Sequence, residues 1–204
     1  MFADAATAAT GGTLQESSDN IKTWDGEGYV TYWFYDATGT EDEDPAYDKK
    51  WYDVIDDSTP TTAGLTTAEG AWYIARAATT LTVTGEVGTN DVSVSLQNGY
   101  NLMANPFPSA ISLNGGGINW AGMGVTGSTL QETSDNIKTW DGEGYVTYWF
   151  YDATGTEDED PAYDKKWYDV IDDSTPTSAS IPAGEGVWFI HRGTATTITL
   201  PSPL

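Results

Sequence analysis

The sequence contains no cysteine, a single histidine and only eight lysine and arginine residues among its 204 positions. Without cysteine there is no disulfide framework, no thiolate nucleophile and no cysteine-based metal site. The few basic residues stand against thirty-one acidic ones, and the formal net charge of -23 repels nucleic-acid phosphates and anionic lipid headgroups. We therefore expect no nucleic-acid partner.

Long hydrophobic runs are also missing. No stretch approaches the roughly eighteen apolar residues that cross a bilayer as a helix, so we expect no membrane insertion. The first ten residues lack the basic and apolar regions of an intact signal peptide. The abundance of Thr, Gly, Ser, Asn, Asp and aromatic residues, with few lysines, nevertheless resembles secreted bacterial surface proteins. We expect a secreted, extracellular protein at the cell surface.

Aromatic residues are plentiful: nine Trp, twelve Tyr and five Phe. High net charge with low hydrophobicity can indicate disorder, but this many large buriable side chains indicates a folded core instead.

The most prominent pattern is an internal repeat. Residues 13–62 recur without a gap as residues 129–178, and only Ser17→Thr133 and Thr62→Ser178 differ. This spacing is too long for a solenoid coil and suits a small domain, so the chain predicts two tandem copies of one module.

Each copy has the pattern of a β structure. Asp25 and Gly26 separate the β-prone runs 20–24 and 29–35, which indicates a hairpin with a type I′ turn. Further β-prone runs follow at 51–55, 70–76 and 80–84, and again in the second copy, while no segment has a sustained helical period. We predict an all-β fold with two tandem antiparallel β-sandwich-like modules.

The segment between the copies occurs once. It contains β-prone runs at 92–96, 100–103 and 110–113 and two prolines, Pro106 and Pro108, that favour a fixed bend. We divide the chain into an N-terminal arm (1–12), a first module (13–96), a connector (97–116) and a second module (117–204). The second copy ends where the connector strands begin in the first, so one module lacks strands that the other has, and its open edge could accept a strand from another chain. The arm is a candidate donor.

The connector also carries a motif, Gly99-Tyr-Asn-Leu-Met-Ala-Asn-Pro-Phe-Pro-Ser-Ala-Ile111. It resembles the GxNLxxNPFPxAI signature of repeats in large secreted or cell-surface proteins of Bacteroidetes and of the Planctomycetes and Verrucomicrobia group. The resemblance extends to the order of the flanking segments. It implies a β-rich surface or adhesin-like module and brings no catalytic residues.

Acidic residues are densest in the loop that follows residue 35. Residues 36–57 hold nine acids and two lysines, a net charge of -7 in each copy. Crowded carboxylates attract hard cations such as Ca²⁺, although the spacing is not that of an EF-hand. A solvated loop is the alternative to a Ca²⁺ site, whose candidate ligands are Asp36, Glu41, Asp42, Glu43, Asp44, Asp48, Asp152, Glu157, Asp158, Glu159, Asp160 and Asp164. We expect no other cofactor.

An enzyme is not expected. The only histidine, His191, corresponds to Ala75 in the first copy, so a duplicated histidine-dependent site is excluded and a single one has no evident nucleophile. We interpret His191 as an exposed strand residue. A carboxylate pair of the glycosidase kind could include Glu69 or Glu185, but nothing distinguishes these two from the other acids.

Aromatic residues occupy both faces of the strand at 29–35, and a strand with one solvent-exposed face would not have this pattern. Part of the set must be core and part must meet another surface or ligand. The candidate interface or ligand aromatics are Trp33, Tyr35, Trp51, Trp149, Tyr151 and Trp167.

Two functions follow from these features. The first is an extracellular structural protein that assembles with itself, as a homopolymer, into a filament, tube or surface layer, with strand complementation between subunits as one route. The second is a carbohydrate-binding or adhesive module of a cell-surface protein that binds extracellular glycans.

Overall fold

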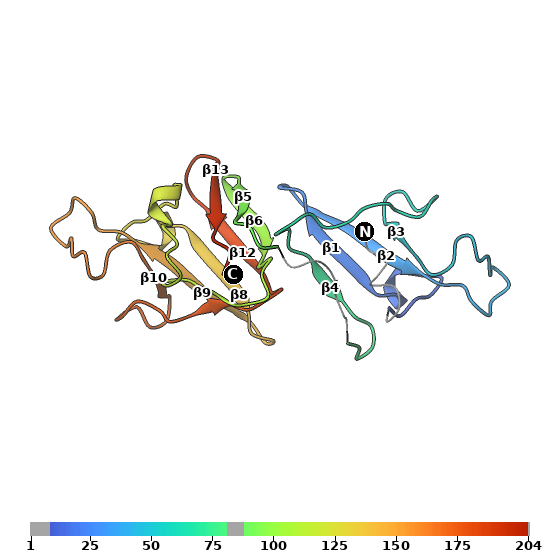
Figure 1. Cartoon of the computed structure of the whole chain (residues 1–204). Helices are drawn as coiled ribbons and strands as arrows, with labels where there is room; N and C mark the ends of the chain where they lie inside the picture. The colour runs from blue at the N-terminus through green and yellow to red at the C-terminus, as the bar shows by residue number, and fades with distance from the viewer. Residues whose placement is uncertain (1–8, 81–87, 204) are drawn as a thin grey trace. The chain divides into compact units, whose positions relative to one another are not determined.

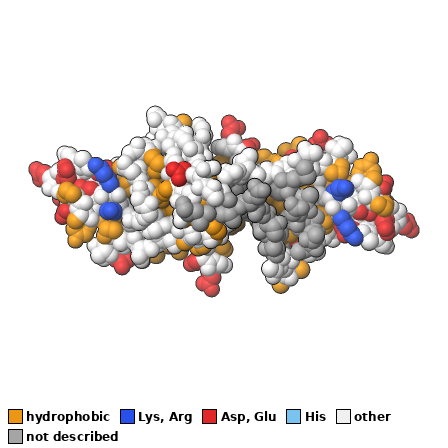
Figure 2. Space-filling view, in the orientation of Figure 1, with side chains coloured by type: hydrophobic (Ala, Val, Ile, Leu, Met, Phe, Trp, Pro, Cys, Tyr) orange, Lys and Arg blue, Asp and Glu red, His pale blue; other side chains and the backbone are white. Residues whose placement is uncertain are grey.

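The structure is a computed structural model that describes residues 9–80 and 88–203, and it has an all-β fold with several antiparallel sheets, as predicted. The chain divides into two compact units (Figure 1). The first comprises residues 1–66 and 71–86, and the second comprises residues 67–70 and 87–204. In the described part of the chain, no helix has the length and apolarity needed to cross a membrane. Figure 2 shows acidic side chains scattered over the visible surface, with few basic ones among them.

The first unit contains one four-stranded antiparallel sheet with the order β3-β2-β1-β4. Its strands are β1 (Asn20–Trp24), β2 (Tyr29–Tyr35), β3 (Lys50–Asp53) and β4 (Trp72–Ile74). The 3-10 turn η2 (Gln15–Ser17) precedes them. The predicted strand at 80–84 falls almost entirely outside the described residues.

The predicted hairpin between β1 and β2 is confirmed, but its loop is longer than a two-residue turn. Trp24 pairs with Tyr29, so the loop spans residues 25–28. The Asp25 carboxylate accepts the backbone N–H groups of Glu27 and Gly28, and Gly26 has a φ of 106°. Asp25 therefore organises the loop through its side chain, which a type I′ turn would not require.

The second unit contains a five-stranded sheet with the order β10-β9-β8-β12-β6 and two two-stranded sheets, β11-β7 and β13-β5. The strands that match those of the first unit are β8 (Asn136–Trp140), β9 (Tyr145–Tyr151), β10 (Lys166–Asp169) and β12 (Gly186–His191). The remaining elements are β5 (Val92–Leu96), β6 (Gly99–Ala104), β7 (Ile111–Ser112), η3 (Ala121–Met123), η4 (Gln131–Thr133), β11 (Ser180–Ile181) and β13 (Thr196–Leu200).

The connector strands belong to the second unit. β5 pairs with β13 over its whole length, β6 pairs with β12, and β7 pairs with β11. This differs from the module boundary predicted at residue 96, because β5 buries Leu96 in the core of the second unit. All three sheets of that unit contribute side chains to one core. The core also contains side chains from the segments between strands, and its large residues include Phe107 of the motif, Trp120, Phe150, Trp167 and Phe189.

The NPFP motif has a structural role in this unit. The Asn105 side-chain amide donates to the carbonyl oxygens of Ser109, Ile181 and Pro182, and its oxygen accepts the N–H of Phe107. The motif thereby fixes the bend between β6 and β7 and joins it to the segment that contains β11.

Candidate functional site

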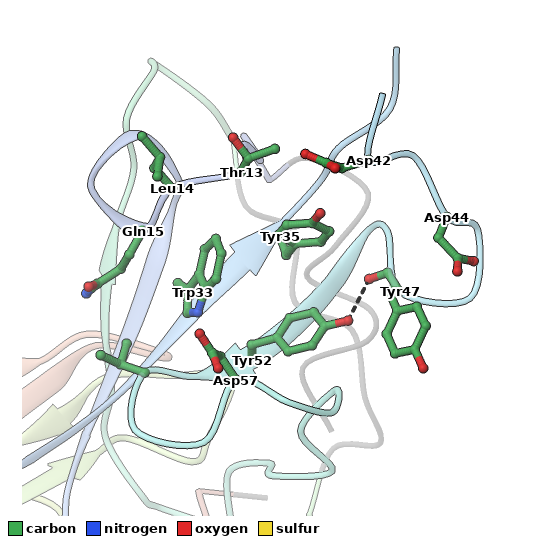
Figure 3. Close-up of a pocket in the computed structure, with 11 residues that line it drawn as sticks. Thr13, Leu14, Gln15, Trp33, Tyr35, Asp42, Asp44, Tyr47, Tyr52 and Asp57 are labelled. Atoms are coloured by element: carbon green, nitrogen blue, oxygen red, sulfur yellow. Dashed lines mark hydrogen bonds between the residues drawn. The ribbon is translucent and has the colours of Figure 1, made fainter. Parts of the chain in front are cut away.

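An aromatic pocket lies on the face of the first unit's sheet that points away from its core. Trp33 and Tyr35 of β2 and Tyr52 of β3 form its floor, and we call these three residues the aromatic cluster (Figure 3). The pocket has a volume of about 650 Å³. Residues 13–15 line one side of it, and Asp42, Asp44, Tyr47, Val54 and Asp57 complete the lining.

The rings of the aromatic cluster pack against one another. Ring centroids lie 5.6 Å apart for Trp33 and Tyr35, 5.7 Å for Tyr35 and Tyr52, and 6.2 Å for Trp33 and Tyr52. The first two pairs are edge to face, which is the favoured geometry of aromatic quadrupoles. The Tyr52 hydroxyl donates to the carbonyl oxygen of Tyr47 at 2.9 Å. The floor of the pocket is therefore fixed before any ligand arrives.

Burial raises the pKa of Tyr52 to about 12, and the neighbouring Tyr35, Tyr47 and Asp48 add to this effect. The phenol is therefore neutral at physiological pH and remains a hydrogen-bond donor.

The second unit repeats this cluster with Trp149, Tyr151 and Tyr168. The corresponding centroid distances are 5.6, 5.6 and 6.1 Å, and the Tyr168 hydroxyl donates to the carbonyl of Tyr163. Burial likewise raises the pKa of Tyr168 to about 12. Because the two copies have the same sequence over this region, the local chain encodes the cluster.

The six predicted interface aromatics separate into two groups. Trp33, Tyr35, Trp149 and Tyr151 belong to the clusters, on the face away from the core. Trp51 and Trp167 do not: they are 4% and 0% exposed, and each packs in the core against a phenylalanine of the adjacent strand, at 5.2 Å from Phe34 and 5.1 Å from Phe150. Strand alternation explains the error, because consecutive residues such as Trp51 and Tyr52 point to opposite faces.

The acidic loop is organised by its own carboxylates. Asp48 is buried and accepts the backbone N–H groups of Ala37 and Asp44 at 3.0 and 2.9 Å. In the second copy Asp164 does the same with Ala153 and Asp160, both at 3.0 Å. Further backbone N–H groups donate to the side chains of Asp36, Glu43, Asp44, Asp152, Glu159 and Asp160.

The predicted grouping of these acids around a Ca²⁺ ion is not found. Within residues 9–80 and 88–203, no three His, Cys, Asp or Glu side chains lie close enough together to hold a metal ion. Backbone amides satisfy several of the carboxylates instead, while Glu41, Asp42, Glu157 and Asp158 are exposed on the loop surface. Ca²⁺ binding by this loop stays a prediction, beside the solvated loop that the sequence left open as its alternative.

His191 is not exposed, contrary to the sequence-based interpretation: its side chain is 0% exposed. Its Nδ1 lies 2.7 Å from the Asp135 carboxylate and its Nε2 lies 2.7 Å from the carbonyl oxygen of Thr194. Each ring nitrogen thus has a polar partner within hydrogen-bond distance. With both nitrogens engaged and no exposed surface, His191 is placed for a structural role.

Sequence reasoning missed a buried aspartate at the centre of each unit. Asp135 also accepts the backbone N–H groups of Thr126 and Arg192, at 2.9 and 2.6 Å. We call Asp19 and Asp135 the hub aspartates, because Asp19 likewise accepts the N–H groups of Thr10 and Arg76.

Each hub aspartate also has one side-chain partner, and this partner differs between the two units. Asp19 accepts the hydroxyl of Tyr73 at 2.7 Å, whereas His191 takes that place at Asp135. One difference between the copies in the sequence indicates this exchange of donors: Tyr73 and Ala75 in the first copy correspond to Phe189 and His191 in the second.

The strand edge beyond β4 is the largest difference between the units. β12 lies between β8 and β6, whereas β4 is the last of the strands that residues 9–80 contribute to the first unit's sheet. Phe189 and Ile190 of β12 are buried, but their counterparts Tyr73 and Ile74 are only half-buried. Ile181 of β11 is 1% exposed, while its counterpart Leu65 is 46% exposed. We call β4 together with Leu65 the open edge of the first unit.

Comparisons with protein-family models, with curated proteins and with solved structures returned no match.

Proposed function

We propose that this protein is an extracellular structural protein whose tandem β modules assemble with one another into a larger structure such as a filament, tube or surface layer. The observation that carries the proposal is the open edge: in the described part of the chain, the same repeat has its sheet continued by β6 in one unit and has no strand beyond β4 in the other. The extracellular location and the likeness to repeats of bacterial surface proteins stay predictions from the sequence.

A sheet edge presents a row of backbone groups that can pair with another strand, and proteins usually protect such edges with lysine, proline or a bulge. β4 consists of Trp72, Tyr73 and Ile74, with neither lysine nor proline. Leu65 adds exposed apolar surface to the first unit, whereas its counterpart Ile181 is buried in the strand β11. Both features support contact with another polypeptide at this edge.

The charge of -23 opposes the approach of two copies, because like-charged surfaces repel one another. At 0.1 M ionic strength, salt largely screens the repulsion between exposed charges that are more than about 10 Å apart. Assembly should therefore increase with both protein concentration and ionic strength.

Light scattering and electron microscopy over a range of protein and salt concentrations test the proposal. The wild-type chain should form larger species, and Leu65→Asp should reduce them because it places a charge on the open edge. Ile55→Asp is the matched control, since Ile55 is 95% exposed on the first unit and lies outside that edge. A wild-type protein that remains monomeric under every condition would contradict self-assembly.

The aromatic pocket favours a second function, the binding of a neutral carbohydrate. Its aromatic floor offers apolar surface to the C–H faces of a sugar ring. The carboxylates of Asp42, Asp44 and Asp57 can accept hydrogen bonds from the hydroxyl groups of the sugar. The acidic lining disfavours anionic ligands. Pockets of this size and mixed lining are typical of small-molecule sites.

A glycan array tests this second function with Tyr35→Ala and Tyr151→Ala combined, so that both clusters are altered. Tyr29→Ala with Tyr145→Ala is the control, because these exposed tyrosines lie at the hairpin ends of β2 and β9. Sugar binding that is lost only in the first variant would support carbohydrate recognition. Equal binding by wild type and both variants, or no binding at all, would contradict it.

A further inference from the structure

The carboxylates of the aromatic pocket have no basic partner. Asp42, Asp44 and Asp57 are exposed and line the pocket, and no lysine or arginine is among the lining residues. Within residues 9–80 and 88–203, none of these three carboxylates forms an ion pair with a lysine or arginine. The pocket therefore presents to a ligand a negative charge that no ion pair neutralises.

The pKa of Tyr35 reflects this charge at the floor of the pocket. Burial raises the pKa of the Tyr35 phenol, and the negative charges of Asp48, Asp42 and Asp44 raise it further. A negative potential that disfavours a phenolate favours a cation at the same place. The electrostatics of the pocket thus do more than exclude anions, because they favour a ligand with positive charge.

The lining also contains aromatic rings that attract cations. Trp33 and Tyr52 are 8% and 4% exposed and support the floor, whereas Tyr35 is half-buried and Tyr47 is 47% exposed. Tyr35 and Tyr47 therefore provide most of the accessible ring surface (Figure 3). The face of a tyrosine ring attracts an ammonium group and also packs against the C–H groups of a sugar.

The size of the pocket indicates a ligand larger than a single ammonium group. Its volume of about 650 Å³ lies in the range of about 300–1,000 Å³ that is typical of small-molecule sites. An ammonium group is about as large as a water molecule, whose share of liquid volume is about 30 Å³. A lysine terminus alone would leave most of the pocket to solvent, whereas a sugar with an amino group would place both a ring and a charge in it.

The second unit has the same residue types at every corresponding position of the lining. All lining residues fall within residues 13–57, and between 13 and 62 the copies differ only at positions 17 and 62, which are not part of the lining. The counterparts of the three lining aspartates are Asp158, Asp160 and Asp173. One chain therefore has two sets of these residues, one in each unit.

We propose that the aromatic pocket, and the same residues in the second unit, bind a glycan that carries free amino groups, with an ammonium group beside the carboxylates and the sugar ring against Tyr35 or Tyr151. This rests on the carbohydrate binding proposed above and refines its ligand class. The aromatic rings that accept a neutral sugar bind it more tightly when the sugar also carries a positive charge.

Calorimetric titration with three β-1,4-linked sugar trimers tests the inference: glucosamine, N-acetylglucosamine and glucose. The trimers share the ring and the linkage, and only the first has ammonium groups. At about pH 5.5, where ordinary carboxyl groups are ionised and aliphatic amines are protonated, the glucosamine trimer should bind at least about fivefold more tightly than either neutral trimer. The preference should decrease at high salt, because salt screens exposed charges.

Removal of the lining charges should remove this preference. The variant combines Asp42→Asn and Asp57→Asn in the first unit with Asp158→Asn and Asp173→Asn in the second, and we call it the Asn variant. Its affinity for the glucosamine trimer should fall at least about fivefold. The neutral trimers should lose less affinity, since the asparagine side chain still accepts hydrogen bonds from hydroxyl groups.

Two controls separate the pocket from the net charge of the chain. Glu27→Gln with Glu143→Gln removes acids from the hairpin loops before β2 and β9, whereas Tyr35 and Tyr151 lie at the other ends of these strands, so this variant should keep the preference. Acetylated trilysine amide has as many ammonium groups as the glucosamine trimer and no sugar ring. It should bind the wild-type chain more weakly than that trimer.

The outcomes separate this inference from carbohydrate binding itself. If the glucosamine trimer binds most tightly and the Asn variant loses this preference, both are supported. If the neutral trimers bind as tightly as the glucosamine trimer, carbohydrate binding stands and the inference is overturned. If trilysine binds equally well, or the control variant loses as much affinity as the Asn variant, the net charge causes the attraction and the inference is overturned. Absence of binding by all three trimers overturns both.

Discussion

The two units share a nearly identical stretch, residues 13–62 and 129–178, but their sheets differ beyond it. β1 and β2 pair in the same register as β8 and β9, and both aromatic clusters have nearly the same ring distances. The difference begins at β4 and β12, where, among the described residues, only the second unit has a further strand. Hairpins and local clusters therefore follow from the repeat itself, whereas burial of the next strand depends on a segment outside it.

The hub aspartates also combine a shared arrangement with one difference between the units, here in the donors to a single carboxylate. Both carboxylates are fully buried, and both accept two backbone N–H groups from equivalent positions. The third donor is the Tyr73 hydroxyl in one unit and the His191 ring in the other. Two substitutions two residues apart have replaced one donor by another while the buried acceptor stayed the same.

The strongest expected contrast comes from placing a charge at the equivalent positions 65 and 181. Ile181→Asp buries a carboxylate beside Ile111 and should destabilise the second unit by about 4 kcal/mol or more. Leu65→Asp should change the stability of the unassembled first unit by no more than about 0.5 kcal/mol, because Leu65 is exposed. Urea denaturation monitored by hydrogen exchange distinguishes the units through residues 63–80 and 179–203, which differ in sequence. Equal losses would contradict the open edge.

Removal of the hub carboxylates should give the next largest effect. Asp135→Ala leaves the buried His191 ring and the N–H groups of Thr126 and Arg192 without their acceptor and should cost the second unit about 2–3 kcal/mol. Asp19→Ala leaves the N–H groups of Thr10 and Arg76 and the Tyr73 hydroxyl without theirs and should cost the first unit a similar amount, about 2–3 kcal/mol. The same denaturation measurement applies. A loss below about 1 kcal/mol in either unit would contradict the role of its hub aspartate.

Exchange of the third donor should give a smaller effect. Tyr73→Phe removes the hydroxyl bond to Asp19 and should destabilise the first unit by about 1–2 kcal/mol. The added change Ala75→His should restore most of this loss, since it supplies the donor found in the second unit. Phe189→Tyr is the control and should give no gain, because His191 already occupies Asp135. Failure of the double variant to recover would indicate that the loop after position 75 must also change.

The smallest expected effect concerns the acid sensitivity that Asp25 and Asp141 give to the hairpin loops, and it should be equal in the two units. Backbone N–H groups of Glu27 and Gly28 lower the pKa of Asp25, and those of Glu143 and Gly144 lower the pKa of Asp141. A lowered pKa in the folded state gives stability that is present above the ordinary value of about 4 and is lost as the pH falls below it. Asp25→Asn and Asp141→Asn should therefore reduce the acid sensitivity of their own units by equal amounts in pH-dependent denaturation. Unequal changes would mean that the hairpin loops respond to the sheets around them.

Prediction from the sequence succeeded where neighbouring residues decide the outcome. The β1–β2 hairpin, the bend at Pro106 and Pro108 and the connector strands follow from turn residues and from alternating β-prone runs. It failed where partners far apart in the sequence decide. His191 is buried because Asp135 lies beside it, 56 residues earlier in the chain.

The sequence by itself determined the all-β class, the duplication, the hairpins and the aromatic cluster of each copy, because period-two patterns and turn chemistry act over a few residues. Only the tertiary structure decided which copy the connector completes and which face of β3 and β10 holds the core tryptophan. Those outcomes depend on pairing between distant strands and on the burial of apolar surface that such pairing allows. Two nearly identical stretches of sequence can therefore end as a completed sheet in one unit and an open edge in the other.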